Sequence, residues 1–137
     1  MLADIAQRYF LEEDYNCAES MLLAANEYYA LGLDSRRCHL LVSAFGGGMG
    51  CGSVCGALAG AMAALGQMTV ADRAHKSENF KEICAGYVAR FEAALGSQRC
   101  DEIKPALFQE GLRCARAVYL AAQELEAYMQ ELGKQNA

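Results

Sequence analysis

The stretch from Gly46 to Gly52 constrains the fold of this 137-residue chain more than any other part of the sequence. Five of its seven residues are glycine, and each glycine inside a helix costs about 1 kcal/mol relative to alanine. The stretch therefore predicts a loop. On both sides of it the chain is rich in Ala, Leu, Met, Glu and Gln, and it has a single Pro and almost no runs of Val, Ile or Thr. That balance favours helices over strands.

Helix start and stop signals divide the rest of the chain. Asn16 with Glu19 forms a capping box, Thr69 with Asp72 indicates a second one, and Pro105 is typical of a first helical turn. We expect helices over residues 2–11, 17–31, 35–45, 53–65, 70–95 and 105–132. The sequence therefore predicts an all-α fold, a single compact bundle of about five to six helices, with residues 1–137 forming one domain.

Charge and hydropathy exclude several classes of function. The formal net charge is −5, and no basic stripe offers a face for nucleic-acid phosphates. The longest apolar region, Val54 to Leu65, is well short of the roughly 20 residues that a membrane-spanning helix needs. We expect no secretory signal, because the first ten residues are amphipathic and carry Asp4 and Arg8. We expect a cytoplasmic protein that neither inserts into membranes nor binds nucleic acid.

Seven cysteines are an unusual number for a chain of this size. The number is odd, and the predicted core is sufficient without disulfides. No Cys-x-x-Cys pair occurs, which argues against thioredoxin chemistry and against the usual zinc-finger layout. In a reducing cytosol the remaining roles are metal ligation, reactive thiols and buried inert thiols.

Cys55 is the strongest candidate among them, because it opens the helix that follows the glycine loop. Free backbone N–H groups and a partial positive charge at a helix start predict a lowered pKa for this thiol. Cys51 stands four residues earlier. On a helix the two Cβ atoms would lie about 5–6 Å apart, so shared ligation of a metal is easier than a disulfide. The alternatives are a packed thiol for Cys55 and a loop thiol without a role for Cys51.

The other five cysteines separate by position. Cys17 follows the Asn16 cap and Cys100 lies in a turn beside an arginine, and both settings favour the thiolate. Cys114 shares a face with apolar residues of the last helix, so its helical phase indicates core packing. Cys38 and Cys84 fall on expected core faces and are interpreted as inert thiols.

Three segments and two single cysteines resemble one known family. The segments are Asn16-Cys-Ala-Glu-Ser20, Phe45-Gly-Gly-Gly-Met-Gly50 and Cys55-Gly-Ala-Leu-Ala-Gly60, and Cys100 and Cys114 follow them. Together they resemble the C_GCAxxG_C_C family of redox-active proteins. The resemblance implies that the characteristic cysteines are Cys17, Cys55, Cys100 and Cys114, which changes the interpretation of Cys114 from core residue to site residue.

The family is also similar to the amino-terminal part of split-Soret cytochromes, which carry an iron–sulfur cluster. This chain has no Cys-x-x-Cys-His haem attachment site, so only the cluster transfers. The resemblance implies an iron–sulfur cluster, most plausibly [2Fe–2S], held by Cys17, Cys55, Cys100 and Cys114, with Cys51 as a further candidate ligand. The cofactor would also contact the glycines of the loop and of the following helix: Gly47, Gly48, Gly50 and Gly56.

Three functions remain open at this point. The first is a metal or iron–sulfur protein that exchanges electrons with an unidentified redox partner. The second is a cluster-free dithiol switch or oxidoreductase, in which Cys55 attacks and Cys51, Cys17 or Cys114 resolves the disulfide. The third is a helical interaction domain with structural cysteines, which could form a homodimer through its alanine-rich helices. For the first function, aerobic purification would strip the cluster and leave an apo form.

Overall fold

The computed structural model describes residues 1–135, and these residues form seven α-helices and no strand. The helices are α1 (Leu2–Glu12), α2 (Cys17–Tyr28), α3 (Ser35–Val42), α4 (Gly56–Thr69), α5 (Phe80–Leu95), α6 (Cys100–Leu107) and α7 (Ala115–Gln135). Short turns η1 (Ser43–Phe45) and η2 (Gly48–Gly52) precede α4, and η3 (Ala74–Lys76) precedes α5. The all-α expectation is confirmed. The described residues contain seven helices, not the five to six expected, because α6 is separate from α7.

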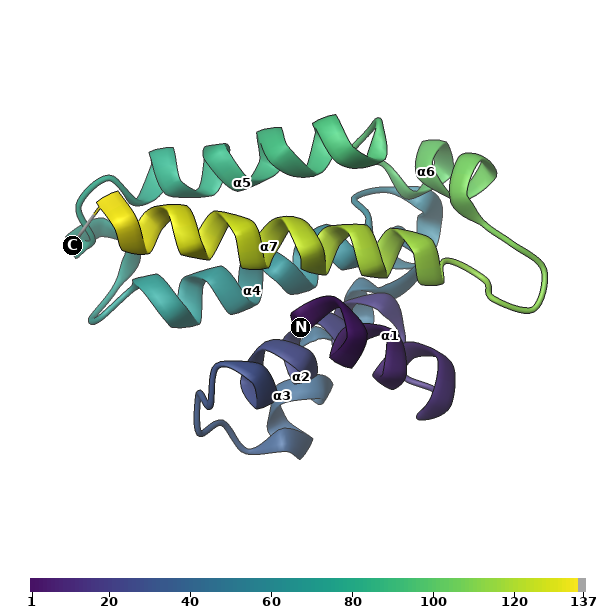
Figure 1. Ribbon diagram of the computed structural model, residues 1–137, viewed down its shortest axis with the longest axis horizontal. Helices are drawn as coiled ribbons and strands as arrows, with labels where there is room; N and C mark the ends of the chain where they lie inside the picture. The colour runs from purple at the N-terminus through teal and green to yellow at the C-terminus, as the bar shows by residue number, and fades with distance from the viewer. Residues whose placement is uncertain (136–137) are drawn as a thin grey trace.

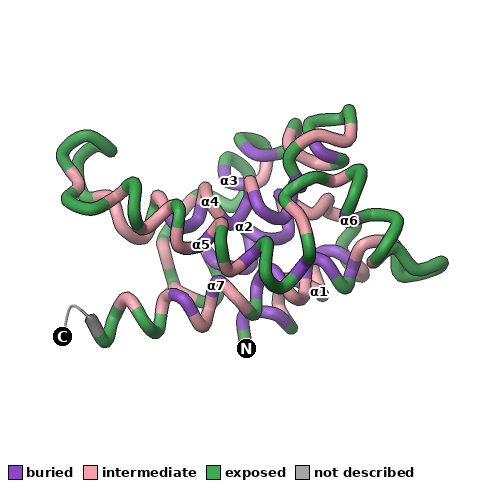
Figure 2. The backbone as a smooth tube through the Cα atoms, turned by 90° about the horizontal axis from the view of Figure 1, so that it is seen from above, coloured by how far each residue is buried: buried purple, intermediate pink, exposed green. Residues whose placement is uncertain are grey.

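The helices pack as a bundle with its core in the middle of the molecule. In Figure 1, α4, α5 and α7 run lengthwise side by side, and α1 lies below one half of α7. Helix α2 packs against both α1 and α4, and α3 packs on α2. Figure 2 shows the buried residues gathered in the centre, while the connection between α6 and α7 is exposed at one end.

Close contacts between backbones and one buried hydroxyl hold the central helices together. A Cβ on Gly60 of α4 would lie 2.5 Å from the carbonyl oxygen of Ala18 in α2, so only glycine allows this crossing. The hydroxyl of Tyr87 in α5 is fully buried and donates to the carbonyl oxygen of Ala121 in α7 over 2.7 Å. This bond satisfies a polar group that would otherwise be costly to bury.

Two expected helix starts are wrong. Thr69 is the last residue of α4, where its hydroxyl donates to the carbonyl oxygen of Leu65 over 2.7 Å, and it caps no following helix because α5 begins only at Phe80. Pro105 lies inside α6 and does not open the last helix. The chain after α6 turns through left-handed backbone at Gly111 (φ +82°) and Arg113 (φ +53°), so a continuous helix from Pro105 is impossible.

Across residues 1–135, none of the helices has the length and apolarity that crossing a membrane requires.

Candidate functional site: a pocket lined by four cysteines

One end of the bundle contains a pocket of about 200 Å³ that four cysteines line. Cys17 is the first residue of α2, Cys55 is the N-cap of α4, and Cys100 is the first residue of α6. Cys114 immediately precedes α7. We call this site the thiol pocket. Four helix starts therefore meet there, and each brings the partial positive charge of a helix N-terminus.

Backbone hydrogen bonds and glycines hold these helix starts close to one another. The N–H of Cys55 donates to the carbonyl oxygen of Gln98 over 2.8 Å, and the N–H of Cys100 donates to that of Ser53 over 2.7 Å. A Cβ on Gly56 would collide with the sulfur of Cys17. A Cβ on Gly48, whose φ is +64°, would lie 2.6 Å from the Cβ of Cys100. Side chains at these two positions would push the cysteines apart.

The glycines named from the sequence differ in their relation to the thiol pocket. Gly47 lines the pocket. Gly48 is buried against Cys100, and Gly56 is buried against Cys17. Gly50 is exposed, and the position that a Cβ would take there has no atom of another residue within 4 Å.

Three cysteines lie outside the residues that line the thiol pocket. Cys51 is exposed on η2, where its thiol contacts the carbonyl oxygen of Gly48 at 3.5 Å. Cys38 is buried in the core at α3. Cys84 is partly buried on α5 and faces a separate surface pocket near His75. The four cysteines of the family pattern are thus brought together, and Cys51 is not brought to them.

The pKa values of Cys55 and Cys17 contradict the expectation from helix starts. Burial raises the pKa of Cys55 to about 12, and Cys17 adds to the rise, although the N–H groups of Ala57 and Leu58 oppose it. Burial likewise raises the pKa of Cys17. The expectation of lowered values was wrong because the side chains are withdrawn from water, and desolvation of the charged form outweighs the helix N–H groups.

Cys114 has a more balanced environment. Burial and the neighbouring Cys100 raise its pKa, whereas the positive charges of Lys104 and Arg113 lower it. Both cations line the thiol pocket. Neither was expected from the sequence, although the signals were present: Lys104 is four residues after Cys100 on one face of α6, and Arg113 directly precedes Cys114.

Two aromatic rings complete the rim of the thiol pocket. The guanidinium of Arg113 stacks over the ring of Phe10 at 4.4 Å and donates to the carbonyl oxygen of Phe10 over 2.9 Å. The ammonium of Lys104 lies 5.5 Å from the ring centre of Phe108. The Arg113 contacts attach the segment between α6 and α7 to α1, and the two contacts together keep both cations beside the thiols.

All seven cysteines are free thiols. Within the part of the chain that the structure describes, no three His, Cys, Asp or Glu side chains stand close enough together to hold a single metal ion. The four sulfurs therefore surround a space and do not form a ready-made site for one ion.

The fold and the pocket define a helical protein that gathers four thiols at converging helix starts. Residues 15–128 match the family described as "Putative redox-active protein (C_GCAxxG_C_C)", and the chain belongs to this family. The matched region contains all four pocket cysteines. We found no match among curated proteins or among solved structures.

Proposed function

We propose that this protein is an electron-transfer protein whose thiol pocket holds an iron–sulfur cluster of the [2Fe–2S] type. The observation that carries the proposal is the convergence of Cys17, Cys55, Cys100 and Cys114 on one pocket from four separate helix starts. Four cysteine thiolates are the usual ligand set of such a cluster. When bound, a cluster supplies a one-electron redox couple, which agrees with the redox-active description of the family.

The chemistry of the pocket fits this ligand. A cluster held by four thiolates carries net negative charge, and the pocket provides Lys104, Arg113 and the positive ends of helices to offset it. The N–H groups of Gly47 and Ala18 lie at the sulfur of Cys17, and those of Ala57 and Leu58 lie at Cys55. Hydrogen bonds of this kind stabilise thiolate ligands and tune the potential of a cluster.

The raised pKa values favour ligation over free-thiol chemistry. The thiolate is the form that attacks disulfides, and a thiol with a pKa of about 12 supplies very little of it near neutral pH. Coordination to a metal deprotonates a thiol outright. The burial that makes Cys55 a poor nucleophile also excludes water from a ligand sulfur, which protects a bound cluster.

A second function is a cluster-free dithiol–disulfide couple. This function is favoured because, within residues 1–135, no three His, Cys, Asp or Glu side chains are arranged so that they could hold one metal ion. Cys114 would be the attacking thiol in this case, because it is only partly buried and has Lys104 and Arg113 beside it. This assignment replaces Cys55 as the attacking group.

For either function we propose a reducing, cytoplasmic location and a redox partner protein. Free thiols persist where thioredoxin and glutathione keep cysteines reduced. The partner would approach the side of the pocket formed by Cys100 and Cys114, which are more exposed than Cys55.

Anaerobic purification followed by an absorption spectrum and by iron and sulfide analysis tests the proposal. We expect charge-transfer bands with about two iron and two sulfide per chain. Serine at Cys17, Cys55, Cys100 or Cys114 should remove or shift the bands, whereas serine at Cys51 or Cys84 should leave them unchanged. Protein without iron after anaerobic purification and after reconstitution would refute the cluster. A reversible disulfide at Cys114 in that protein would establish the second function.

A further inference from the structure

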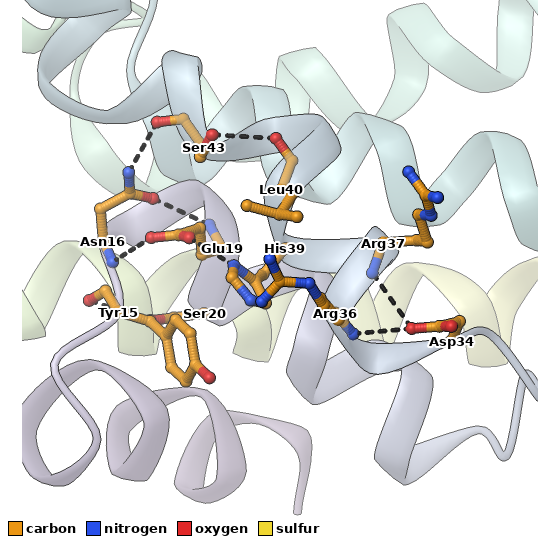
Figure 3. Close-up of polar contacts among 10 residues, drawn as sticks. All are labelled: Tyr15, Asn16, Glu19, Ser20, Asp34, Arg36, Arg37, His39, Leu40 and Ser43. Atoms are coloured by element: carbon orange, nitrogen blue, oxygen red, sulfur yellow. Dashed lines mark hydrogen bonds and ion pairs between the residues drawn. The ribbon is translucent and has the colours of Figure 1, made fainter.

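We propose that His39 is a positioning residue for Cys17 and acts on it through Glu19 and Asn16. Figure 3 shows the carboxylate of Glu19 between Asn16 and the imidazole of His39. His39 is on α3 and is not among the residues that line the thiol pocket. Any effect of His39 on a pocket cysteine is therefore indirect. This inference rests on the proposed function for the identity of the ligand that the Cys17 sulfur binds. The positioning of that sulfur does not depend on the ligand.

The two oxygens of the Glu19 carboxylate have separate partners. Oε1 accepts from the backbone N–H of Asn16 over 3.1 Å, which closes the capping box at the start of α2. Oε2 lies 2.8 Å from Nδ1 of His39. An ionised carboxylate only accepts hydrogen bonds, so His39 must donate from Nδ1. One side chain thus joins α3 to the helix start that carries Cys17.

His39 is held in place for this contact. Its ring packs against the ring of Tyr15, with 5.0 Å between the centroids. The side chains of His39 and Glu19 are only 19% and 14% exposed, so the bond between them is largely shielded from water. Within residues 1–135, no other basic side chain pairs with Glu19. A shielded, charge-assisted hydrogen bond is stronger than an ion pair on the surface.

Asn16 connects Glu19 to the loop beside the pocket through hydrogen bonds of its side-chain amide. Its Oδ1 accepts from the N–H of Glu19 over 2.9 Å, and its Nδ2 donates to the carbonyl oxygen of Ser43 over 2.9 Å. A Cβ on Gly46 would lie 2.5 Å from Nδ2 of Asn16, so the glycine loop rests directly on this amide. Asn16 itself lines the thiol pocket next to Cys17.

The consequence for Cys17 is a fixed sulfur position. Cys17 is the first residue of α2, where helices fray unless the cap holds. The N–H groups of Gly47 and Ala18 that approach its sulfur belong to the loop and to the helix that Asn16 joins. Without the bond from His39, Glu19 is free to rotate away from the cap, and the sulfur of Cys17 becomes more accessible to water.

The test is the alkylation rate of each cysteine in the reduced, iron-free, full-length protein, measured by mass spectrometry of peptides after timed exposure to iodoacetamide. In His39→Phe the ring and its packing on Tyr15 remain but the donor is lost. We expect the rate at Cys17 to rise about fivefold relative to Cys84, which corresponds to the roughly 1 kcal/mol of a typical cap. If this variant does not fold, His39→Leu, which also lacks a donor, carries the same prediction.

His39→Asn provides the rescue that separates positioning from bulk packing. The amide nitrogen of asparagine can occupy the place of Nδ1, so the Cys17 rate should return to within about twofold of the original protein. Arg37→Asn is the matched control on the same helix, and it should change no rate. The proposal is overturned if His39→Phe leaves Cys17 unchanged, if the Phe and Asn variants accelerate it equally, or if Cys84 accelerates by the same factor. Because no iron is present, failure of the cluster proposal does not affect this result.

Discussion

Replacing Cys55 with alanine should make the iron-free protein less sensitive to alkaline pH. The folded pKa of Cys55 is about 12, compared with its ordinary value of 9.0. Below about pH 8 the thiol is almost entirely neutral in both the folded and unfolded chains, so it contributes almost nothing to the pH dependence. Between pH 9 and pH 12 the unfolded chain releases the proton more readily, and stability falls as the pH rises.

The size of this effect follows from the shift. At pH 10 the unfolded thiol is mostly ionised and the folded one is not, which lowers the free energy of unfolding by roughly 1 kcal/mol. Urea unfolding at pH 8 and pH 10, with reductant and without iron, measures it. The original protein should lose roughly 1 kcal/mol more than Cys55→Ala over this interval. Tyrosines and lysines titrate in the same range, so the difference between the two proteins is the quantity to compare.

Cys51→Ala is the control, because Cys51 is an exposed thiol of the same chain. It should lose as much stability between pH 8 and pH 10 as the original protein. Equal losses of stability in Cys55→Ala and in the original protein would contradict the raised pKa, since the folded Cys55 thiol would then ionise like a solvated one.

Two further substitutions test the packing around the pocket and the core. Gly56→Ala should destabilise the fold by about 1–3 kcal/mol in urea titrations, because the added Cβ collides with the Cys17 sulfur. In Gly66→Ala, on the same helix, the added Cβ meets nothing within 4 Å, so this variant should be neutral or stabilised by up to about 1 kcal/mol. Equal effects of the two substitutions would contradict the close approach of Gly56 to Cys17. Tyr87→Phe should cost about 1 kcal/mol in the same assay, since it removes the buried hydrogen bond to the carbonyl oxygen of Ala121, and a loss below the error of the assay would contradict the role of that hydrogen bond.

Local features of the fold were predictable from the sequence. The capping box of Asn16 and Glu19 is formed as expected, because it depends on residues within one turn of helix. The helix starts predicted at Thr69 and Pro105 were wrong, because the same residue types also occur at helix ends and in last turns. Only the path of the chain after each helix distinguishes these cases.

In the thiol pocket, too, features set within one turn of helix were predictable from the sequence, and features set by contacts between distant helices were not. The positions of Cys17 and Cys55 at helix starts were predictable, but the direction of their pKa shifts was not, because burial depends on helices far away in the sequence. The helical phase of Cys114 indicated the core, yet this residue lies just before α7, where helical phase has no meaning. The bond between His39 and Glu19 joins two helices and has no sequence signal of its own.

The distribution of the four pocket cysteines along the chain has a consequence for folding. Residues 17, 55, 100 and 114 divide most of the sequence into three segments, and each segment begins and ends at the pocket. A ligand bound to all four sulfurs closes three chain loops at once, and the unfolded chain loses the configurational entropy of those loops. Occupancy of the pocket and folding would then be thermodynamically linked, so the occupied protein would have a larger free energy of unfolding than the empty one.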